Sequence, residues 1–244
     1  ASDVYKRQVS DLAMTDPEYA RFFKYFDEEE VAKTVEPVLG KTRRHFVILA
    51  TLLGCGGKEE FEVRLPQALD AGVTPTQVRE IVYQGTAYLG MGRVRGFVDI
   101  MNRVFTSRGV KLPLPDTTEQ KDVERVVKGE AAQVEIFGPG MKGFSKSGPE
   151  KTVAIRRWLS ANCFGDYYTR GGLDYKQREM ITFCFLAALG GCEPQLTSHA
   201  GANLRIGNDN AFLIQVISQC LPYIGYPRSL NALRCVNDAA QAAR

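Results

Sequence analysis

The sequence lacks the features that mark several protein classes. Its 31 basic and 28 acidic residues nearly cancel, and no stripe of basic and aromatic residues occurs, so we expect no nucleic-acid partner. The longest uncharged runs, such as Met180 to Cys192, fall short of the ~20 residues that span a bilayer, so we predict no membrane segment. These absences favour a soluble globular protein.

Metal-binding and disulfide patterns are also missing. The six cysteines form no C-x-x-C pair and no metal-finger spacing, and four of them lie in apolar runs where cysteine behaves as a small buried hydrophobe. The two histidines, with no paired acidic spacing, make a poor ligand set. We therefore predict reduced thiols, as in the cytoplasm, and no metal. Residues 1–11 have no apolar stretch of the kind found in secretory signals, and we assign them no structural role.

What the sequence does contain is an internal repeat. Without a gap, a shift of 135 positions pairs identical residues from Lys41 to Asn102, including Lys41 with Lys176, Gly56 with Gly191, Gln84 with Gln219, Tyr88 with Tyr223 and Asn102 with Asn237. Self-similarity at one unaltered offset is the mark of a duplicated structural unit. We predict a first copy over residues 12–108, a linker over 109–118 and a second copy over 119–244.

Each copy is predicted to be helical. Sustained alternation of apolar and polar residues is absent from the sequence, whereas apolar runs closed by glycine recur, so the fold class is all-α. The expected helices of the first copy are 16–34, 41–54, 58–72, 73–90 and 92–107, with Thr74 as an N-cap. Those of the second copy are 119–136, 149–164, 175–190, 193–207, 208–225 and 227–242, with Asn208 or Asp209 as a cap. The two halves should pack as a pseudo-dimer, because each alone would leave apolar surface bare.

Polar residues distinguish the two copies. Under the same shift the second copy differs from the first at five polar positions, which pair His199 with Arg64, Glu179 with Arg44, Glu193 with Lys58, Cys192 with Gly57 and Gln195 with Glu60. Residues that both copies share serve the fold, so unshared polar residues point to a site in the second copy. His45 has no histidine counterpart, and we assign it no special role.

On the helix that begins near Glu193, helical spacing places Cys192, Gln195, His199 and Asn203 on one side. Cys192 lies at the positive end of that helix, which lowers the pKa of a thiol and predicts a reactive cysteine. The plainer interpretation also stands: His199 is a hydrogen-bonded core residue, Glu193 complements the helix dipole and Cys192 fills space.

Glu179 precedes an apolar run and is a candidate proton donor or acceptor if it faces inward. Simple antiparallel packing offsets it from His199 by roughly 8 to 10 Å along the helix axis, at about 1.5 Å per residue. Direct contact between the two side chains therefore does not follow from the sequence, and bridging by water or substrate is the alternative.

Three stretches of the second copy resemble the carboxymuconolactone decarboxylase family. "REMITFCFLAALGGCEPQLTSHAGANLRIGN" is similar to the family's R-E, apolar helix and G-G-x-E-P-Q-L-x-x-H, and "YIGYPRSLNAL" to its Y-x-G-x-P with N-A. "FGDYYTRGGLDYKQRE" is similar to F-G-x-x-W-x-R-P-G-L-D, with Tyr168 and Gly171 in place of tryptophan and proline. The resemblance implies an all-α bundle that assembles into trimers or hexamers, here a trimer of two-copy chains or a hexamer.

The resemblance also implies cofactor-free decarboxylation of a small anionic lactone or keto acid. His199 would give or take the proton, Glu179 would set its charge state, and Arg170 or Arg178 would hold the carboxylate, with Tyr168 and Gln195 as further substrate contacts. Arg178 has a competing structural interpretation, because Arg43 occupies the same place in the first copy.

Two other functions remain open. A thiol redox protein would centre on Cys192, since the related alkylhydroperoxidase D branch carries C-x-x-C-x-x-x-H, but Gln195 replaces its second cysteine. A non-catalytic assembly protein would tolerate replacement of His199.

Overall fold

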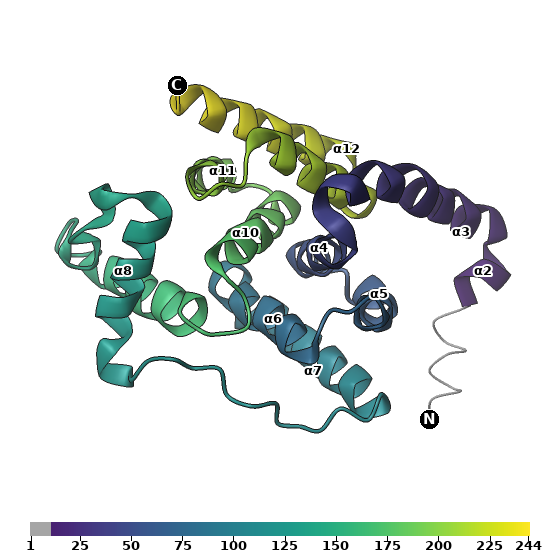
Figure 1. The fold of residues 1–244 in the computed structure, drawn as a ribbon, viewed down its shortest axis with the longest axis horizontal. Coiled ribbons are helices and arrows are strands. Elements are labelled where there is room, and N and C mark those ends of the chain that lie inside the picture. Colours follow the sequence, from purple (N-terminus) through teal and green to yellow (C-terminus); the bar gives the residue numbers. More distant parts are fainter. Residues whose placement is uncertain (1–10) are drawn as a thin grey trace.

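The computed structural model describes residues 11–244, which form helices and no strand (Figure 1). The first half contains α2 Asp11–Thr15, α3 Pro17–Lys24, the π-helix η1 Tyr25–Val31, α4 Ala32–Cys55, α5 Lys58–Asp70, α6 Pro75–Leu89 and α7 Met91–Ser107. The second half contains η2 Asp122–Glu124, α8 Arg125–Phe137, η3 Pro139–Met141, η4 Phe144–Lys146, α9 Val153–Trp158, the π-helix η5 Leu159–Tyr168, α10 Tyr175–Leu189, α11 Glu193–Arg205 and α12 Asn210–Ala242. Within this part of the chain no helix is long and apolar enough to cross a membrane.

Helix starts follow the capping signals of the sequence. Thr74 caps α6: its hydroxyl accepts a hydrogen bond from the Gln77 backbone N–H, and the Gln77 side-chain oxygen accepts one from the Thr74 backbone N–H. Asp209 is the cap of α12, since its carboxylate accepts from the Phe212 N–H. Asn208 instead donates to the Lys176 carbonyl, which ties the start of α12 to α10.

Some expected helix boundaries are wrong, whereas two others coincide with kinks at glycine. The helix expected over 16–34 passes through a π-helix into α4, whose bend lies at Gly40 with φ 72°. The last two expected helices meet within α12 at a kink, where Gly225 has non-helical backbone angles with φ 79°, so the break expected at this glycine is confirmed. Glycine reaches this left-handed region without a Cβ clash, so the chain changes direction without a separate loop. The helix expected over 149–164 begins only at Val153 and continues as η5.

The two copies share one hydrophobic core. Helices α4 and α10, the apolar helix of each copy, pack against each other, α12 packs on α4, and α6 packs on both α4 and α10. Phe46 and Leu49 from α4 and Phe183 and Phe185 from α10 are fully buried in it. Burial of both apolar faces in one interior confirms that the halves pack as a pseudo-dimer.

In each copy, one helix supplies side chains that contact residues of the other copy. Gln84 on α6 accepts a hydrogen bond from Arg178 at 3.0 Å, and its repeat partner Gln219 on α12 accepts one from Arg44 at 2.8 Å. Tyr88 on α6 lies edge-on to His199 with ring centroids 5.5 Å apart, and its repeat partner Tyr223 carries Arg64 over its ring at 5.7 Å. Two related sites therefore exist, one on each side of the shared core.

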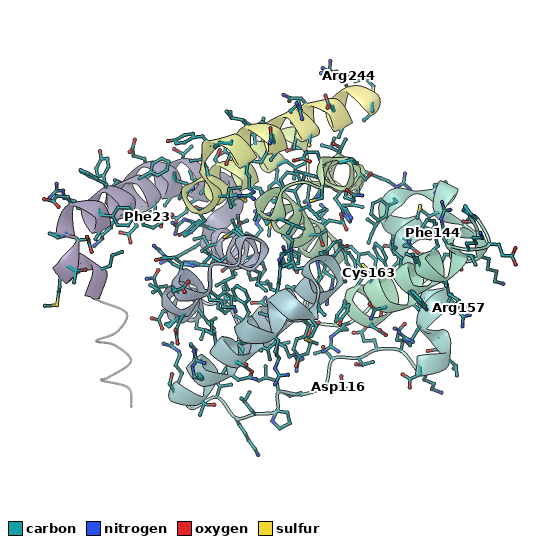
Figure 2. The ribbon with its side chains drawn as sticks, turned by 180° about the vertical axis from the view of Figure 1, so that it is seen from behind. Phe23, Asp116, Phe144, Arg157, Cys163 and Arg244 are labelled. Atoms are coloured by element: carbon teal, nitrogen blue, oxygen red, sulfur yellow. The ribbon has the colours of Figure 1, made fainter. Side chains whose placement is uncertain are left out.

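The segment between the repeated helices forms a separate end of the molecule, where α8 lies against η5 (Figure 1). Their contact requires glycine: a Cβ on Gly129 would lie 1.7 Å from the Ser160 carbonyl oxygen, and one on Gly165 would lie 2.5 Å from the Arg125 carbonyl oxygen. Seen from behind, Cys163 lies between this end and the central helices (Figure 2). The close packing holds α8 beside α11.

Candidate active site

The centre of the site is a buried acid–base pair. His199 Nδ1 lies 2.7 Å from Oε2 of Glu179, whose side chain is fully buried. Asn203, one turn after His199, donates to the backbone carbonyls of both Glu179 and His199 and so ties α11 to α10 at this level. Direct contact did not follow from the sequence, and the structure shows it: no water or substrate is needed to bridge the two side chains.

A network of donors converges on Glu179. The Tyr168 hydroxyl donates to Glu179 Oε1 at 2.7 Å, Thr182 lies 2.6 Å from that hydroxyl, and the Gln84 amide donates to Thr182 at 2.8 Å. With the Tyr168 proton committed to Glu179, Thr182 donates to Tyr168. Both carboxylate oxygens thus accept, one from Tyr168 and one from His199, which suits an ionised Glu179.

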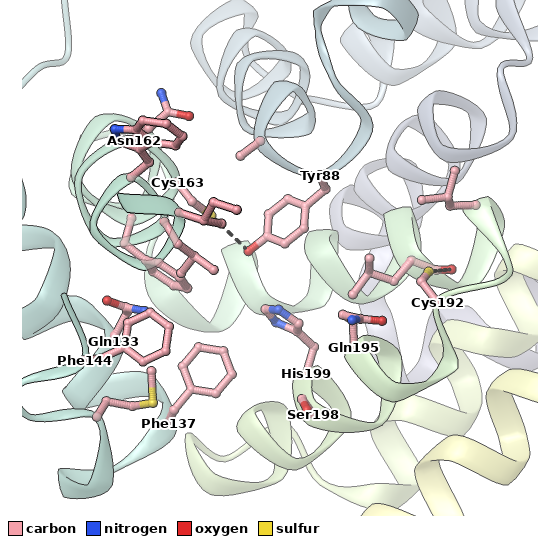
Figure 3. A pocket seen from close by; sticks show the side chains of 18 residues that line it. Tyr88, Gln133, Phe137, Phe144, Asn162, Cys163, Cys192, Gln195, Ser198 and His199 are labelled. Atoms are coloured by element: carbon pink, nitrogen blue, oxygen red, sulfur yellow. Dashed lines mark hydrogen bonds between the residues drawn. The ribbon is translucent and has the colours of Figure 1, made fainter. Parts of the chain in front are cut away.

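Tyr88 and Cys163 extend this network. The Tyr88 hydroxyl lies 3.0 Å from that of Tyr168, and the Cys163 thiol donates to Tyr88 at 3.6 Å, the bond dashed in Figure 3. Burial raises the pKa of the Cys163 thiol to about 12 and that of both tyrosines well above the ordinary value. All three stay protonated and neutral, and therefore serve as hydrogen-bonding groups.

His199 opens onto a cavity of ≈ 630 Å³ (Figure 3). Its ring lies edge-on between two aromatic rings, Tyr88 at 5.5 Å and Phe137 at 5.2 Å between centroids. Across residues 11–244 the only hydrogen bond of the imidazole uses Nδ1, which leaves Nε2 for a ligand. The pair can therefore exchange a proton with a molecule in the cavity while Glu179 holds the far side of the ring.

The cavity wall is largely apolar. Its lining residues come from α6, α8, η3, η4, α9, η5, α10 and α11: Ala87, Tyr88, Gln133, Phe137, Met141, Phe144, Ile155, Trp158, Leu159, Asn162, Cys163, Phe164, Leu186, Leu189, Cys192, Gln195, Ser198 and His199. No Asp, Glu, Lys or Arg side chain is among them, and apart from the imidazole the polarity comes from amides, hydroxyls and thiols. An apolar wall strengthens the electrostatic effect of the few polar groups present.

Of the residues predicted for the site, His199, Gln195 and Cys192 line the cavity. Glu179 does not line the cavity and contacts the Nδ1 side of the His199 ring. Tyr168, predicted as a substrate contact, lies one layer deeper, where its hydroxyl positions Glu179.

The two arginines predicted to bind a carboxylate do not line this cavity. Arg170 forms a two-point ion pair with Glu80 of the first copy, with Nε–Oε1 at 2.8 Å and Nη2–Oε2 at 3.1 Å. Arg178 is fully buried and pairs with Glu80 at 3.1 Å and with Gln84 at 3.0 Å. The expectation that Arg170 faces the site is therefore wrong, because an internal carboxylate already occupies its guanidinium. The contacts of Arg178 agree with the alternative interpretation, in which this arginine serves the fold.

The pKa of Cys192 is raised, contrary to the expectation from its place at the helix start. Burial is the main cause, followed by the negative charge of Glu193 and by Cys235. The thiol also donates to the Leu186 carbonyl at 3.5 Å. Desolvation outweighs the helix dipole here, so the structure does not favour a reactive thiolate.

Sequence reasoning missed four residues that shape the cavity, namely Tyr88, Gln133, Phe137 and Trp158. Tyr88 was assigned to the fold because Tyr223 repeats it, yet the exchange of helices between copies places Tyr88 against His199. Gln133 and Phe137 lie on α8, which falls outside the repeat, and Trp158 lies on α9, ahead of the stretch over which the repeat was detected. Their aromatic and amide character was visible, but nothing in the sequence placed them opposite α11.

In the first copy both corresponding positions carry arginine. Arg44 and Arg64, the repeat partners of Glu179 and His199, both bind the buried Asp27, at 3.0 and 3.3 Å. No set of His, Cys, Asp and Glu side chains suited to a metal occurs within residues 11–244. The acid–base pair is thus confined to the second copy.

Comparison with known proteins gives one family. The model of the carboxymuconolactone decarboxylase family matches the chain twice, over residues 17–102 and 154–238. The segment 103–153, which includes α8, falls outside both matches. A search of curated proteins finds no match.

Proposed function

Since the chain belongs to the carboxymuconolactone decarboxylase family, we propose that it is a cofactor-free carboxy-lyase acting on an unsaturated lactone or keto carboxylic acid. The observation that carries this proposal is the 2.7 Å contact between His199 Nδ1 and the buried Glu179, with Nε2 facing a cavity. A histidine oriented by a carboxylate on one nitrogen and open on the other is suited to general acid–base catalysis.

In the proposed reaction the bond between the substrate carbon and its carboxylate breaks, and its electron pair moves into the conjugated carbonyl. Carbon dioxide leaves, and an enolate remains. Protonated His199 then delivers the Nε2 proton to the enolate carbon, and the imidazole is reprotonated from solvent. Glu179 keeps the Nδ1–H in place and stabilises the imidazolium before transfer.

The wall of the cavity supports this chemistry. A carboxylate concentrates its charge on two oxygens, whereas the transition state spreads that charge toward the carbonyl, so an apolar surrounding disfavours the reactant more. The substrate carbonyl is the electron acceptor, and no further group is required to take the electrons. Gln195 and Ser198, beside His199 on α11, are available to donate hydrogen bonds to the carboxylate or carbonyl oxygen.

The thiol redox alternative has less support. Its central requirement is an activated Cys192 thiolate, and burial raises the pKa of that thiol. Gln195 occupies the position that a resolving cysteine would need.

The test is release of carbon dioxide, with ultraviolet absorbance followed in parallel, from a panel of unsaturated lactone and keto acids. His199→Gln should reduce kcat by roughly 10²–10⁴-fold, the range typical of lost acid–base catalysis. Cys192→Ser should leave turnover unchanged.

Tyr168→Phe supplies a finer test of the same pair. It removes one hydrogen bond to a charged acceptor and should lower kcat by roughly ten- to a hundredfold, with little change in KM. Turnover that survives His199→Gln would refute the proposal. Loss of turnover in Cys192→Ser with rapid peroxide oxidation of the wild-type thiol would favour the redox alternative.

A further inference from the structure

One wall of the cavity comes from a part of the chain outside both family matches. Gln133, Phe137, Met141 and Phe144 line the cavity from α8, η3 and η4, all within residues 103–153. We call these four residues the cap. Because the cap faces His199 across the cavity, it is placed to select the substrate of the proposed reaction.

Gln133 is the polar member of the cap, and half of its amide has no protein partner. It is 1% exposed, and its Oε1 accepts a hydrogen bond from the Ser160 hydroxyl at 2.5 Å. Its Nε2 is buried with no partner within residues 11–244. A buried donor without an acceptor costs free energy, which a ligand oxygen in the cavity would recover.

Gln133 and His199 lie on opposite sides of the Phe137 ring (Figure 3). A ligand that reaches both must therefore pass along an aromatic surface. Its polar ends would meet the imidazole and the amide, and its middle would contact Phe137 and Phe144.

The mouth of the cavity is apolar as well. Trp158 and Ile155 line it from α9, with 62% and 60% of their surface exposed. Large apolar side chains left exposed beside a cavity are typical of a surface that an apolar ligand covers.

The charges near the cavity restrict how many carboxylates the substrate can carry. The cavity offers one ionisable partner for a carboxylate, His199, because Arg170 and Arg178 are bound to Glu80. A second carboxylate would lie against the cap, where Gln133 supplies a neutral donor and the other three residues are apolar. Burial of an unpaired charge is far costlier than burial of a hydrogen-bonded carbonyl.

We propose that the cavity takes a monocarboxylic substrate with a bulky apolar body, whose lactone or ketone oxygen accepts a hydrogen bond from Gln133. The part of this inference that concerns the substrate's carboxylate rests on the proposed function. The part that concerns its apolar body and carbonyl oxygen rests on the cap. Gln133 is a specificity-determining residue, and small dicarboxylic lactones are poor ligands.

The sole tryptophan of the chain, Trp158, reports occupancy of the cavity mouth by fluorescence. The probes are an uncharged aryl-substituted unsaturated lactone, its cyclic-ether analogue without the carbonyl oxygen, and a small dicarboxylic lactone. The aryl lactone should bind at least tenfold more tightly than the dicarboxylate. It should also bind about three- to tenfold more tightly than the cyclic ether, the worth of one hydrogen bond.

Two glutamine variants separate the amide from general effects. Gln133→Leu should lose the three- to tenfold preference for the lactone over the ether. Gln215→Leu is the matched control, since Gln215 also has a buried amide atom without a partner but lies on α12, away from the cavity. It should keep the preference. The ligand comparison on the wild-type protein stands even if Gln133→Leu fails to fold.

Equal or tighter binding of the dicarboxylate would overturn the inference, as would a lactone preference that survives in folded Gln133→Leu. Carbon dioxide release from small dicarboxylic lactones at full rate in Gln133→Leu would refute the substrate class while leaving the carboxy-lyase function intact. The expected binding pattern without carbon dioxide release from any aryl monocarboxylic lactone would refute the function and support the cap as a ligand site.

Discussion

Replacing Glu80 with glutamine should destabilise the protein more than any exposed charge substitution. The Glu80 carboxylate is fully buried and accepts hydrogen bonds from Arg170 at 2.8 and 3.1 Å, Arg178 at 3.1 Å, Arg79 at 3.3 Å and Thr117 at 3.1 Å. These partners belong to the first copy, the linker and the second copy, so one side chain joins all three. Glutamine keeps the shape and removes the charge.

The size of the effect follows from Arg178. Its guanidinium is fully buried, and within residues 11–244 Glu80 is its only ionic partner; its other acceptors are the Gln84 amide and the carbonyls of Arg170 and Gly171. Removing one partner of a buried ion pair typically costs about 3–5 kcal/mol, because the remaining charge stays buried. We expect Glu80→Gln to lower the free energy of unfolding by about that amount.

Urea denaturation monitored by circular dichroism measures the change. Asp99→Asn is the matched control, because Asp99 pairs with Arg95 on the surface, where both side chains are more than half exposed. It should cost less than about 0.5 kcal/mol. A loss below about 1 kcal/mol in Glu80→Gln would refute the view that this carboxylate neutralises buried arginine.

The same carboxylate predicts acid sensitivity. Burial alone would raise the pKa of Glu80, but hydrogen bonds and charge from Arg170 and then Arg178 outweigh it and hold the pKa below the ordinary value. The unfolded chain therefore binds the proton first as the pH falls, so the stability that Glu80 contributes is present above its ordinary pKa and is lost in acid. Glu80→Gln should flatten this part of the stability profile.

Three further predictions concern other parts of the chain. Burial, then the charges of Arg44 and Arg64, lower the pKa of His45 to about 4, so stability should fall by up to about 3 kcal/mol as the pH drops from about 6.5 to 4, and His45→Leu should remove this slope in pH-dependent urea titrations. Gly129→Ala should cost about 1–3 kcal/mol by forcing α8 away from Ser160, whereas Gly201→Ala, in a helix with nothing within 4 Å of the added Cβ, should not destabilise; equal midpoints would contradict the argument. Light scattering should give the mass of a trimer or hexamer of two-copy chains, and a monomer would refute that expectation.

The repeat made much of the fold predictable. One offset joined two sets of glycine-terminated helices, and the structure contains α4, α5, α6, α10 and α11 close to their expected positions. The kinks at Gly40 and Gly225 fall at expected helix boundaries, whereas nothing in the sequence showed that the helix expected over 16–34 continues through a π-helix to Gly40. Comparison of the two copies also singled out His199 and Glu179, since neither has a counterpart in the first copy.

The same comparison failed where side chains of one copy serve the other. Tyr88 and Gln84 are repeated, and so were taken for fold residues, yet they contact His199 and the Glu179 network from the opposite copy. Arg170 is not repeated and was taken for a substrate residue, yet Glu80 holds it. Comparing the two copies shows which residues differ between them, but it does not show which residues are in contact in the folded protein.

By itself, then, the sequence determined the all-α class, the duplication and the helix faces, because periodicity, caps and glycines act over a few residues. Tertiary structure alone decided that Glu179 touches His199, that the arginines face inward to Glu80 and that α8 places Gln133 and Phe137 across the cavity. These outcomes depend on how distant helices cross, and crossing is set by the packing of whole surfaces in three dimensions.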